Sequence, residues 1–431
     1  MYNMDTAKNI DLEVLGLSEL VKENTKRNRM STVQLCVTAQ DGTPVENASI
    51  EVRQTKGAFK FGCNAFMATQ FENEEENNLY DSRFQKIFNQ AVVPFYWRDD
   101  EPEKGKYRFE TGSPYIYRRP PADDVLAWCD RLGIEPKAHN MIWLNRSVGL
   151  PKWMPVDKTK MQKTIDDRIK MLADLYADKI PVWDVTNEVA ASDKYEVMPA
   201  DFEVRAHKLA DELFPDNHLI FNDYYGFYND SYKGKRSTPY LFIQKILANG
   251  GRIDGIGIQH HLFIKEDDIK NDNDMLRAEH FFEMLSLYSE LNKDLHISEI
   301  TVPSYDKTEE KLEVQAKIVE NFYRIWFSTK NVKSIVWWNL VDGCAFVNPE
   351  NSSWNEDYYS GGLLNRDFTE KPAYKVLDKL INEEWKTNCK TTAKDGKLTL
   401  DMFHGDYEIT VNGIKVNATV KEDTFILPLT I

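Results

Sequence analysis

The stretch VWDVTNE (residues 182–188) is a short apolar run that ends in a carboxylate. Upstream of it, Ile165, Ile169, Leu172 and Tyr176 recur at the spacing that places side chains on one face of a helix. An amphipathic helix followed by a short buried strand is the repeating unit of a parallel sheet. The two segments together therefore predict one helix and the following strand of such a sheet.

Seven other short apolar runs alternate with amphipathic segments along the chain. They are FKFGCNAF (59–66), AVVPFYW (91–97), KAHNMIW (137–143), LIFND (219–223), IGIQHH (256–261), LHISEI (295–300) and SIVWWNL (334–340). Eight strands, each followed by a helix, are the number that closes a barrel. We therefore predict an α/β fold, a (β/α)8 TIM barrel over residues 58–387. Its final helix is expected near Lys371-Pro372, because proline suits a first helical turn.

The two flanks of this region alternate polar and apolar residues, with Asp-Gly and Asn-Gly turn pairs between the alternating runs. Neither flank alone is large enough for a core. Residues 31–57 and 388–431 are therefore predicted to combine into one small all-β, sandwich-like accessory unit, which we interpret as a structural brace. Residues 1–30 are predicted as an N-terminal helical segment, with a helix near 8–28.

The composition restricts the partners of the chain. There are 69 acidic and 54 basic side chains, for a net charge of −15, which argues against nucleic acid and anionic membrane surfaces as partners. No apolar run is long enough to span a bilayer, and the first 30 residues lack an export signal. Localisation stays open: secreted or periplasmic if a signal peptide has been removed, otherwise cytoplasmic with imported oligosaccharides as substrates. The five cysteines have no metal-binding spacing, so neither metal nor cofactor is expected, and we expect a monomer.

Two of the eight strands end in a glutamate, Glu188 and Glu299. In a TIM barrel, catalytic groups lie at the carboxyl ends of the strands, so these two carboxylates are expected to converge. An isolated glutamate at such a position is more often a helix cap or a loop ion pair. Here the other strand ends supply amides, imidazoles and aromatic rings: His139, Trp143, Asn187, Tyr224, Gln259, His261 and Trp338. This mixture suits a sugar, whose hydroxyls bind amides and whose ring faces stack on aromatic side chains.

The alternation of side chains along a strand separates neighbours on these motifs. Trp337 and His260 point away from Trp338 and His261, and we interpret them as packing residues. Asp184 and Asp223 are interpreted as buried hydrogen-bonding partners. Two carboxylates about 5 Å apart in such a site would perform retaining glycoside hydrolysis, with one protonated and the other ionised.

These motifs resemble glycoside hydrolase family 10, best known for endo-β-1,4-xylanases. WDVTNE is similar to the acid/base motif W-D-V-x-N-E of that family, and ISEI to the nucleophile motif I-T-E-L/I. The resemblance continues through AHNMIW, FNDYY, DGIGIQHH, VWWNLVD and GGLLNRDFTEKPAY, over roughly residues 60–385. It implies that Glu188 is the general acid/base, that Glu299 is the nucleophile, and that Asn187 reaches the sugar 2-hydroxyl. It also implies five sugar-lining residues, His139, Trp143, Gln259, His261 and Trp338, with His261 hydrogen-bonded to the nucleophile.

One motif departs from the family. The segment E-N-x-M-K-W on the second strand, whose Glu, Asn and Lys bind sugar on the non-reducing side, is replaced here by VVPFYWRDDEP (92–102). Arg98 is expected to contact the substrate in their place. The loop at 112–124 is long and offers Tyr115, Tyr117, Arg118 and Arg119 to the cleft. An anionic or decorated sugar recognised by arginine is therefore an open alternative.

The sequence thus predicts a retaining β-glycoside hydrolase that acts by double displacement on a β-linked polysaccharide or oligosaccharide and resembles the endo-β-1,4-xylanases. One alternative is a retaining enzyme of the same family with a non-xylan or anionic, decorated substrate. Another is a catalytically inactive carbohydrate-binding barrel, and the presence of both Glu188 and Glu299 favours the enzyme. An inverting mechanism, which needs a wider separation of the carboxyl groups, is a lesser alternative.

Overall fold

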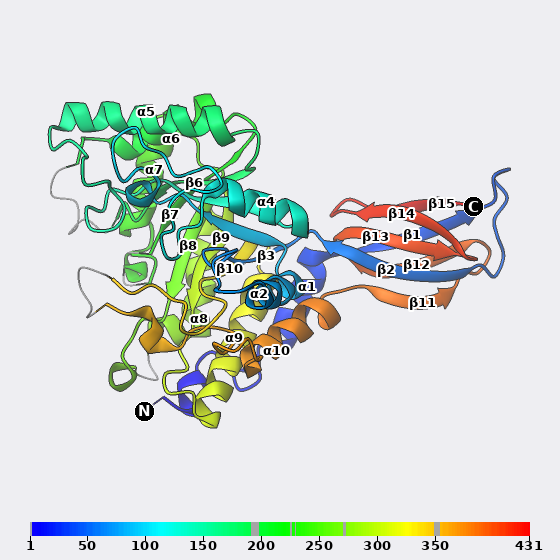
Figure 1. Ribbon diagram of the computed structural model, residues 1–431. Helices are drawn as coiled ribbons and strands as arrows, with labels where there is room; N and C mark the ends of the chain where they lie inside the picture. The colour runs from blue at the N-terminus through cyan, green and yellow to red at the C-terminus, as the bar shows by residue number, and fades with distance from the viewer. Residues whose placement is uncertain (1, 191–197, 225, 229, 270–272, 349–353) are drawn as a thin grey trace.

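The computed structural model describes residues 2–190, 198–224, 226–228, 230–269, 273–348 and 354–431. Eight parallel strands close into a barrel in the order β10-β3-β4-β5-β6-β7-β8-β9 (Figure 1). Their bounds are β3 Lys60–Asn64, β4 Gln90–Pro94, β5 Glu135–Ile142, β6 Val182–Asn187, β7 His218–Asp223, β8 Gly255–His261, β9 Asp294–Thr301 and β10 Val332–Trp337. Each of the eight predicted apolar runs forms one of these strands, so the TIM barrel is confirmed.

Helices lie between the barrel strands and cover the outside of the barrel. They are α2 Glu74–Ile87, the short α3 Trp97–Asp100, α4 Ala122–Leu132, α5 Lys158–Tyr176, α6 Phe202–Leu213, α7 Thr238–Ala248, α8 Ala278–Ser289, α9 Glu309–Ser328 and α10 Pro372–Lys379. The apolar stripe of α5 is buried against the sheet at Ile165, Ile169 and Leu172. The last helix, α10, begins at Pro372 as predicted. None of the helices in the described part of the chain combines the length and the apolarity needed to cross a bilayer.

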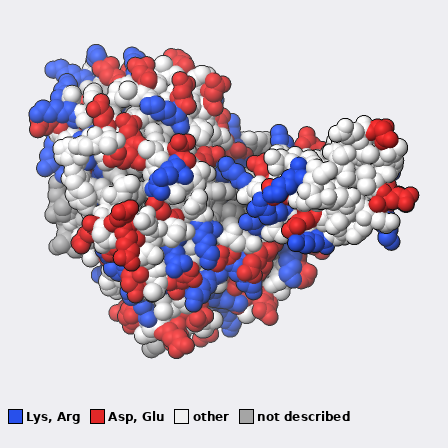
Figure 2. Space-filling model, turned by 45° about the vertical axis from the view of Figure 1, so that its right-hand side comes forward, with Lys and Arg blue, Asp and Glu red and all other residues white. Residues whose placement is uncertain are grey.

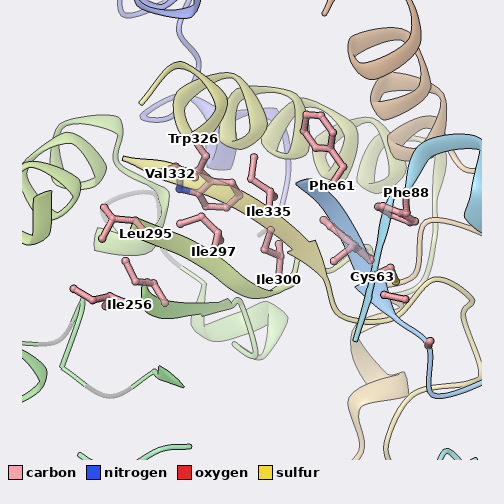
Figure 3. Close-up of a cluster of buried hydrophobic side chains, with 14 of the residues drawn as sticks. Phe61, Cys63, Phe88, Ile256, Leu295, Ile297, Ile300, Trp326, Val332 and Ile335 are labelled. Carbon is pink, nitrogen blue, oxygen red and sulfur yellow. The ribbon is translucent and has the colours of Figure 1, made fainter. Parts of the chain in front are cut away.

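The barrel core is built from the near-continuous apolar faces of its strands. Figure 3 shows Leu295, Ile297 and Ile300 of β9 packed beside Ile335 of β10, with Trp326 of α9 covering them. Strands that are buried on both faces read as unbroken apolar runs rather than as alternating ones. This is why the strands of the barrel could be recognised from short apolar segments alone.

The flanks form two small sheets beside the barrel (Figure 1). One sheet has the order β12-β1-β15, from β1 Met30–Thr38, β12 Lys397–Phe403 and β15 Ile426–Thr430. The other has the order β11-β2-β13-β14, from β2 Ser49–Gly57, β11 Asn388–Thr392, β13 Gly405–Val411 and β14 Ile414–Val420. Side chains of both sheets share one hydrophobic core, so strands from both flanks build one sandwich.

The sandwich is attached at the amino-terminal ends of barrel strands. Strand β2 ends at Gly57, three residues before β3 begins at Lys60. On the other flank of the junction, Arg29 donates hydrogen bonds to the carbonyls of Phe327, Thr329 and Val332, at the turn that leads into β10. The sandwich therefore lies at the end of the barrel opposite to the carboxyl ends of its strands. Figure 2 shows charged side chains of both signs interspersed over the barrel, and fewer of them on the sandwich.

The N-terminal helix is shorter than predicted. A short 3-10 turn, η1, spans Met4–Ala7, and α1 spans Ser18–Arg29, so the helix expected near 8–28 begins ten residues later. Two local features keep the residues before Ser18 out of the helix. The carboxylate of Asp11 accepts the amide of Glu13, and Gly16 adopts a positive φ of 69°. A side chain that bonds its own backbone competes with helix formation.

Candidate active site

The carboxyl ends of the barrel strands surround one cavity of about 650 Å³. Nine of the ten residues predicted for the site line it: His139, Trp143, Asn187, Glu188, Tyr224, Gln259, His261, Glu299 and Trp338. They come from six consecutive strands of the barrel, β5 to β10, or from the residues directly after those strands. The cavity is therefore the place where the strand ends converge.

Glu299 lies on β9 with both carboxylate oxygens in hydrogen bonds. Its Oε1 accepts the side-chain amide of Asn222 at 3.0 Å, and its Oε2 accepts Nε2 of His261 at 3.1 Å. The other ring nitrogen of His261 lies 2.9 Å from the hydroxyl of Thr301, which fixes the orientation of the imidazole. The side chain of Glu299 is only 6% exposed, so the carboxylate is held rigidly at the floor of the cavity.

A network of amides connects Glu299 with the end of β6. The oxygen of the Asn187 side chain accepts from Asn222 at 2.8 Å and from Gln259 at 3.2 Å. Because its oxygen is occupied in this way, Asn187 presents its NH2 group as the donor. Asn222 was not among the predicted site residues, although it occupies the next-to-last position of the run LIFND. Its position near the carboxyl end of a predicted strand was the feature that could have indicated a site residue.

Glu188 follows β6 in an unusual backbone conformation. Its φ is 54°, in the left-handed region, and its amide donates to the carbonyl of Asn222 at 2.9 Å. The turn continues through Ala190, whose amide donates to the carboxylate of Asp223 at 2.7 Å. A left-handed residue other than glycine costs on the order of 1–2 kcal/mol, so these two contacts hold the turn in place. Asp223 thus has the buried hydrogen-bonding role expected from its strand position.

Three buried ionisable groups, Lys137, His139 and Asp184, are in contact beside Glu299. Asp184 accepts Nδ1 of His139 at 2.8 Å and pairs with the ammonium of Lys137 at 3.0 Å. Burial acts to raise the pKa of Asp184, but Lys137 and His139 together outweigh burial, and the pKa is lowered from its ordinary value of 3.8. The free ring nitrogen of His139, Nε2, is 3.8 Å from Oε1 of Glu299. Asp184 therefore orients the imidazole beside Glu299.

Replacing Asp184 with asparagine is expected to destabilise the fold by about 3–5 kcal/mol near neutral pH, because the buried ammonium of Lys137 loses its counter-charge. A lowered carboxyl pKa stabilises the folded state above the unfolded pKa, and this stabilisation is lost as pH falls through the folded pKa. The difference between wild type and variant should therefore shrink on acidification. Denaturant unfolding near pH 7 and pH 3 measures it, with the exposed Asp174→Asn as control. An unchanged difference at both pH values would contradict the assignment.

Neighbouring ring-bearing residues on one strand point to opposite sides of the barrel wall, as their positions predicted. The ring of Trp338 lies in the cavity wall, in edge contacts with Phe66, His139 and His261. Trp337 points the other way, and its indole donates to backbone carbonyls outside the cavity. His260 is likewise buried outside the cavity among rings of the helices, and burial lowers its pKa to about 3.

Arg98 is not part of the cavity lining. It belongs to α3, and its guanidinium donates to the carbonyl of Ser147 on the β5–α5 loop. Two other arginines, Arg118 and Arg119, line the cavity instead. They lie at the end of the long loop whose tyrosines, Tyr115 and Tyr117, remain largely exposed outside the lining.

Several lining residues were absent from the predicted set. They are Tyr96, Asn145, Arg146, Ser147, Val148, Tyr228, Phe263, Met275, Phe346, Asn348, Trp354 and Glu356. Most of them lie in the loops after the strands, where no periodic pattern indicates which side chain faces inward. Glu356 is a third glutamate in the lining, and burial raises its pKa despite the opposing effects of Arg118 and His261.

A cavity lined by glutamates, amides and aromatic rings on a TIM barrel fits an enzyme that hydrolyses O-glycosyl bonds. The family described as Glycosyl hydrolase family 10 matches residues 51–380. The chain therefore belongs to glycosyl hydrolase family 10, and the retaining mechanism follows from that membership.

Among similar proteins, Endo-1,4-beta-xylanase B of Thermotoga neapolitana is 24% identical over 67% of this chain and 79% of its own length. The Anti-sigma-I factor RsgI6 of Acetivibrio thermocellus is 25% identical over 91% of this chain, which spans 46% of that protein. The crystal structure of native xylanase 10B from Thermotoga maritima superposes with a TM-score of 0.60 at 20% identity. The superposition covers 76% of this chain and 96% of the xylanase chain, and it supports the same fold.

Proposed function

We propose that this chain is a retaining β-glycoside hydrolase of the endo-β-1,4-xylanase type, with Glu299 as nucleophile and Glu188 as general acid/base. The observation that carries the proposal is the placement of Glu299, whose two oxygens are held by Asn222 and His261 in the cavity that Glu188 also lines. A carboxylate fixed by donors on both oxygens is oriented for attack, while a second carboxyl group in the same cavity supplies the proton.

The first half of the reaction forms a covalent intermediate. An oxygen of Glu299 attacks the anomeric carbon, the bond from that carbon to the glycosidic oxygen breaks, and Glu188 donates its proton to the leaving oxygen. In the second half, Glu188 takes a proton from a water molecule. That water attacks the anomeric carbon and displaces Glu299. Two displacements at one carbon restore its original configuration.

The remaining lining residues hold the sugar during both steps. The NH2 group of Asn187 is free to donate to a sugar hydroxyl, because its carbonyl oxygen is occupied by Asn222 and Gln259. The rings of Trp143 and Trp338 offer apolar faces to the sugar. The indole nitrogen of Trp143 is buried and has no hydrogen-bond partner among the described residues, so it is a further donor toward a ligand.

The proposal is tested by following hydrolysis of β-1,4-xylan, defined xylo-oligosaccharides and an aryl β-xyloside. Proton NMR of the first-formed product should show the β-anomer, and mass analysis should show internal cleavage of the polymer. An α-anomer formed first would establish inversion and overturn the retaining mechanism. Absence of turnover on every β-linked pentose and hexose glycan, together with measurable sugar binding, would favour the inactive binding barrel.

A further inference from the structure

One wall of the cavity carries two guanidinium groups. Arg118 and Arg119 follow each other at the end of the loop between α3 and α4, and both line the cavity together with Tyr96. Arg118 is 2% exposed and Arg119 is 7% exposed. Apart from the two glutamates assigned to the reaction, the only acidic lining residue in the described part of the chain is Glu356. Two guanidinium groups therefore face one lining carboxylate outside the reacting pair.

Arg119 is already compensated by neighbouring groups. Its Nε donates to the carboxylate of Asp99 at 3.0 Å, and its Nη1 donates to the carbonyl of Arg118 at 2.9 Å. Its guanidinium carbon lies 3.6 Å from the centre of the Tyr96 ring, which is a close cation–π contact. These contacts fix Arg119 and balance its charge.

Among the described residues Arg118 has a cation–π contact with the ring of Phe66, at 5.3 Å from its centre, but no ion-paired carboxylate. Its Nη1 donates to the side-chain oxygen of Asn339 at 2.7 Å and to the carbonyl of Cys344, and its main-chain amide donates to Gln70. Among the described residues, Nε and Nη2 have no hydrogen-bond partner, and no carboxylate lies within ion-pair distance. A buried cation is costly unless it is paired, so the fold holds Arg118 in place without completing its interactions.

The carboxylate of Glu356 is connected to Arg118 only through the side-chain amide of Asn339. The side-chain nitrogen of Asn339 donates to Oε2 of Glu356 at 3.2 Å, while its oxygen accepts from Arg118. The amide therefore stands between the two charged groups. Burial raises the pKa of Glu356, against the opposing effects of Arg118 and His261. A ligand carboxylate in the cavity would supply the missing partner, because its two oxygens match the donors of a guanidinium.

The position of this wall indicates which part of the substrate it meets. Arg118 and Glu356 lie in the loops after β4 and β10, which flank β3 in the barrel order, whereas Glu188 follows β6 across the barrel. Glu299 is on β9, next to β10. The leaving group is protonated on the side of Glu188. The wall therefore faces the glycone, the part of the substrate that stays bound to Glu299.

We propose that the cavity recognises a β-glycan whose glycone carries a uronic acid carboxylate, and that Arg118 is the residue that determines this specificity. The inference rests on the proposed hydrolase function and adds the substrate class to it. The carboxylate could belong to a uronosyl branch on a neutral main chain or to a uronosyl unit of the main chain itself. Both sources present the same planar anion to the guanidinium.

The test compares each acidic oligosaccharide with its methyl ester, which has nearly the same shape and no charge. The substrates are β-1,4-xylo-oligosaccharides with a glucuronosyl branch and β-linked oligoglucuronides. We expect wild type to have a kcat/KM about tenfold or more above that of the ester for one of these two acids, and this identifies the source. The Arg118→Gln variant should lose about 10- to 100-fold on that acid, the range of a hydrogen bond to a charged group, and less than about threefold on the ester. Arg118→Lys should recover part of the loss.

The control variant is Arg205→Gln, which removes the same charge from an outer helix where Arg205 pairs with Asp166. It should hydrolyse acid and ester like wild type. Equal rates on acid and ester in wild type, or equal losses on both in Arg118→Gln, would overturn the inference and leave Arg118 a structural role.

Failure of the hydrolase proposal is recognised separately. Calorimetric binding of the acid and the ester to the Glu299→Gln chain requires no turnover. Tighter binding of the acid supports the carboxylate site even if no glycan is hydrolysed, and equal binding contradicts it.

Discussion

Glu299→Ala is expected to lower kcat on an aryl β-xyloside by about 10⁵-fold, because it removes the carboxylate proposed to form the covalent intermediate. The overall fold should persist, since the side chain is a single carboxylate at the cavity floor, hydrogen-bonded to Asn222 and His261. Stopped assays of initial rate, with circular dichroism on the same preparation, measure both properties.

Added azide makes this result diagnostic. In Glu299→Ala the small anion fits the space left by the carboxylate and attacks the anomeric carbon directly, so a single displacement should yield the α-glycosyl azide. The matched control is Glu203→Gln, which changes a buried glutamate of α6 that pairs with Lys245 outside the cavity. Its activity should remain within about twofold of wild type. A Glu299→Ala chain that retains more than a hundredth of the wild-type rate would exclude Glu299 as nucleophile.

Glu188→Gln is expected to have an effect that depends on the leaving group. On xylan, whose leaving group is an unactivated sugar hydroxyl, the loss of the general acid should lower kcat/KM by about 10³- to 10⁴-fold. On a dinitrophenyl β-xyloside the leaving group needs no proton, so kcat/KM should change little while kcat falls, because water is no longer activated by a general base. Steady-state and pre-steady-state kinetics on the two substrates separate these steps.

Azide again reports the role of the residue. In the Glu188→Gln chain azide should raise kcat on the activated substrate and give the β-glycosyl azide, since Glu299 is still present and two displacements occur. Equal losses on both substrates would argue that Glu188 binds the substrate and does not transfer the proton.

The sequence predicted those parts of the molecule that depend on short periodic patterns. The eight strands were found because each is buried on both faces. The nine lining residues were found because they stand at the ends of these strands or directly after them, in motifs that resemble the family. Trp337 and Trp338 show the alternation of side chains along a strand at single-residue precision.

The predictions that failed concern segments whose conformation is set by contacts between residues far apart in the sequence. Arg98 and Arg118 both belong to the region that departs from the family, and only the folded loop determines which of them reaches the cavity. Gln70 fixes the loop by accepting the amide of Arg118 and donating to the carbonyl of Ile116, and both contacts span more than forty residues of sequence. The late start of α1 has a similar origin. The main-chain amide of Leu12 donates to the side-chain oxygen of Asn321 on α9, which holds the segment before the helix against the barrel.

The placement of the sandwich has a practical consequence for handling this protein. Because it joins the barrel at the amino-terminal ends of the strands, its far hairpin at Asn412-Gly413 is exposed on the side away from the cavity mouth. A single chemical linkage at this hairpin would fix the protein to a solid support with the cavity turned outward. An insoluble polymer could then reach the immobilised protein without passing the support.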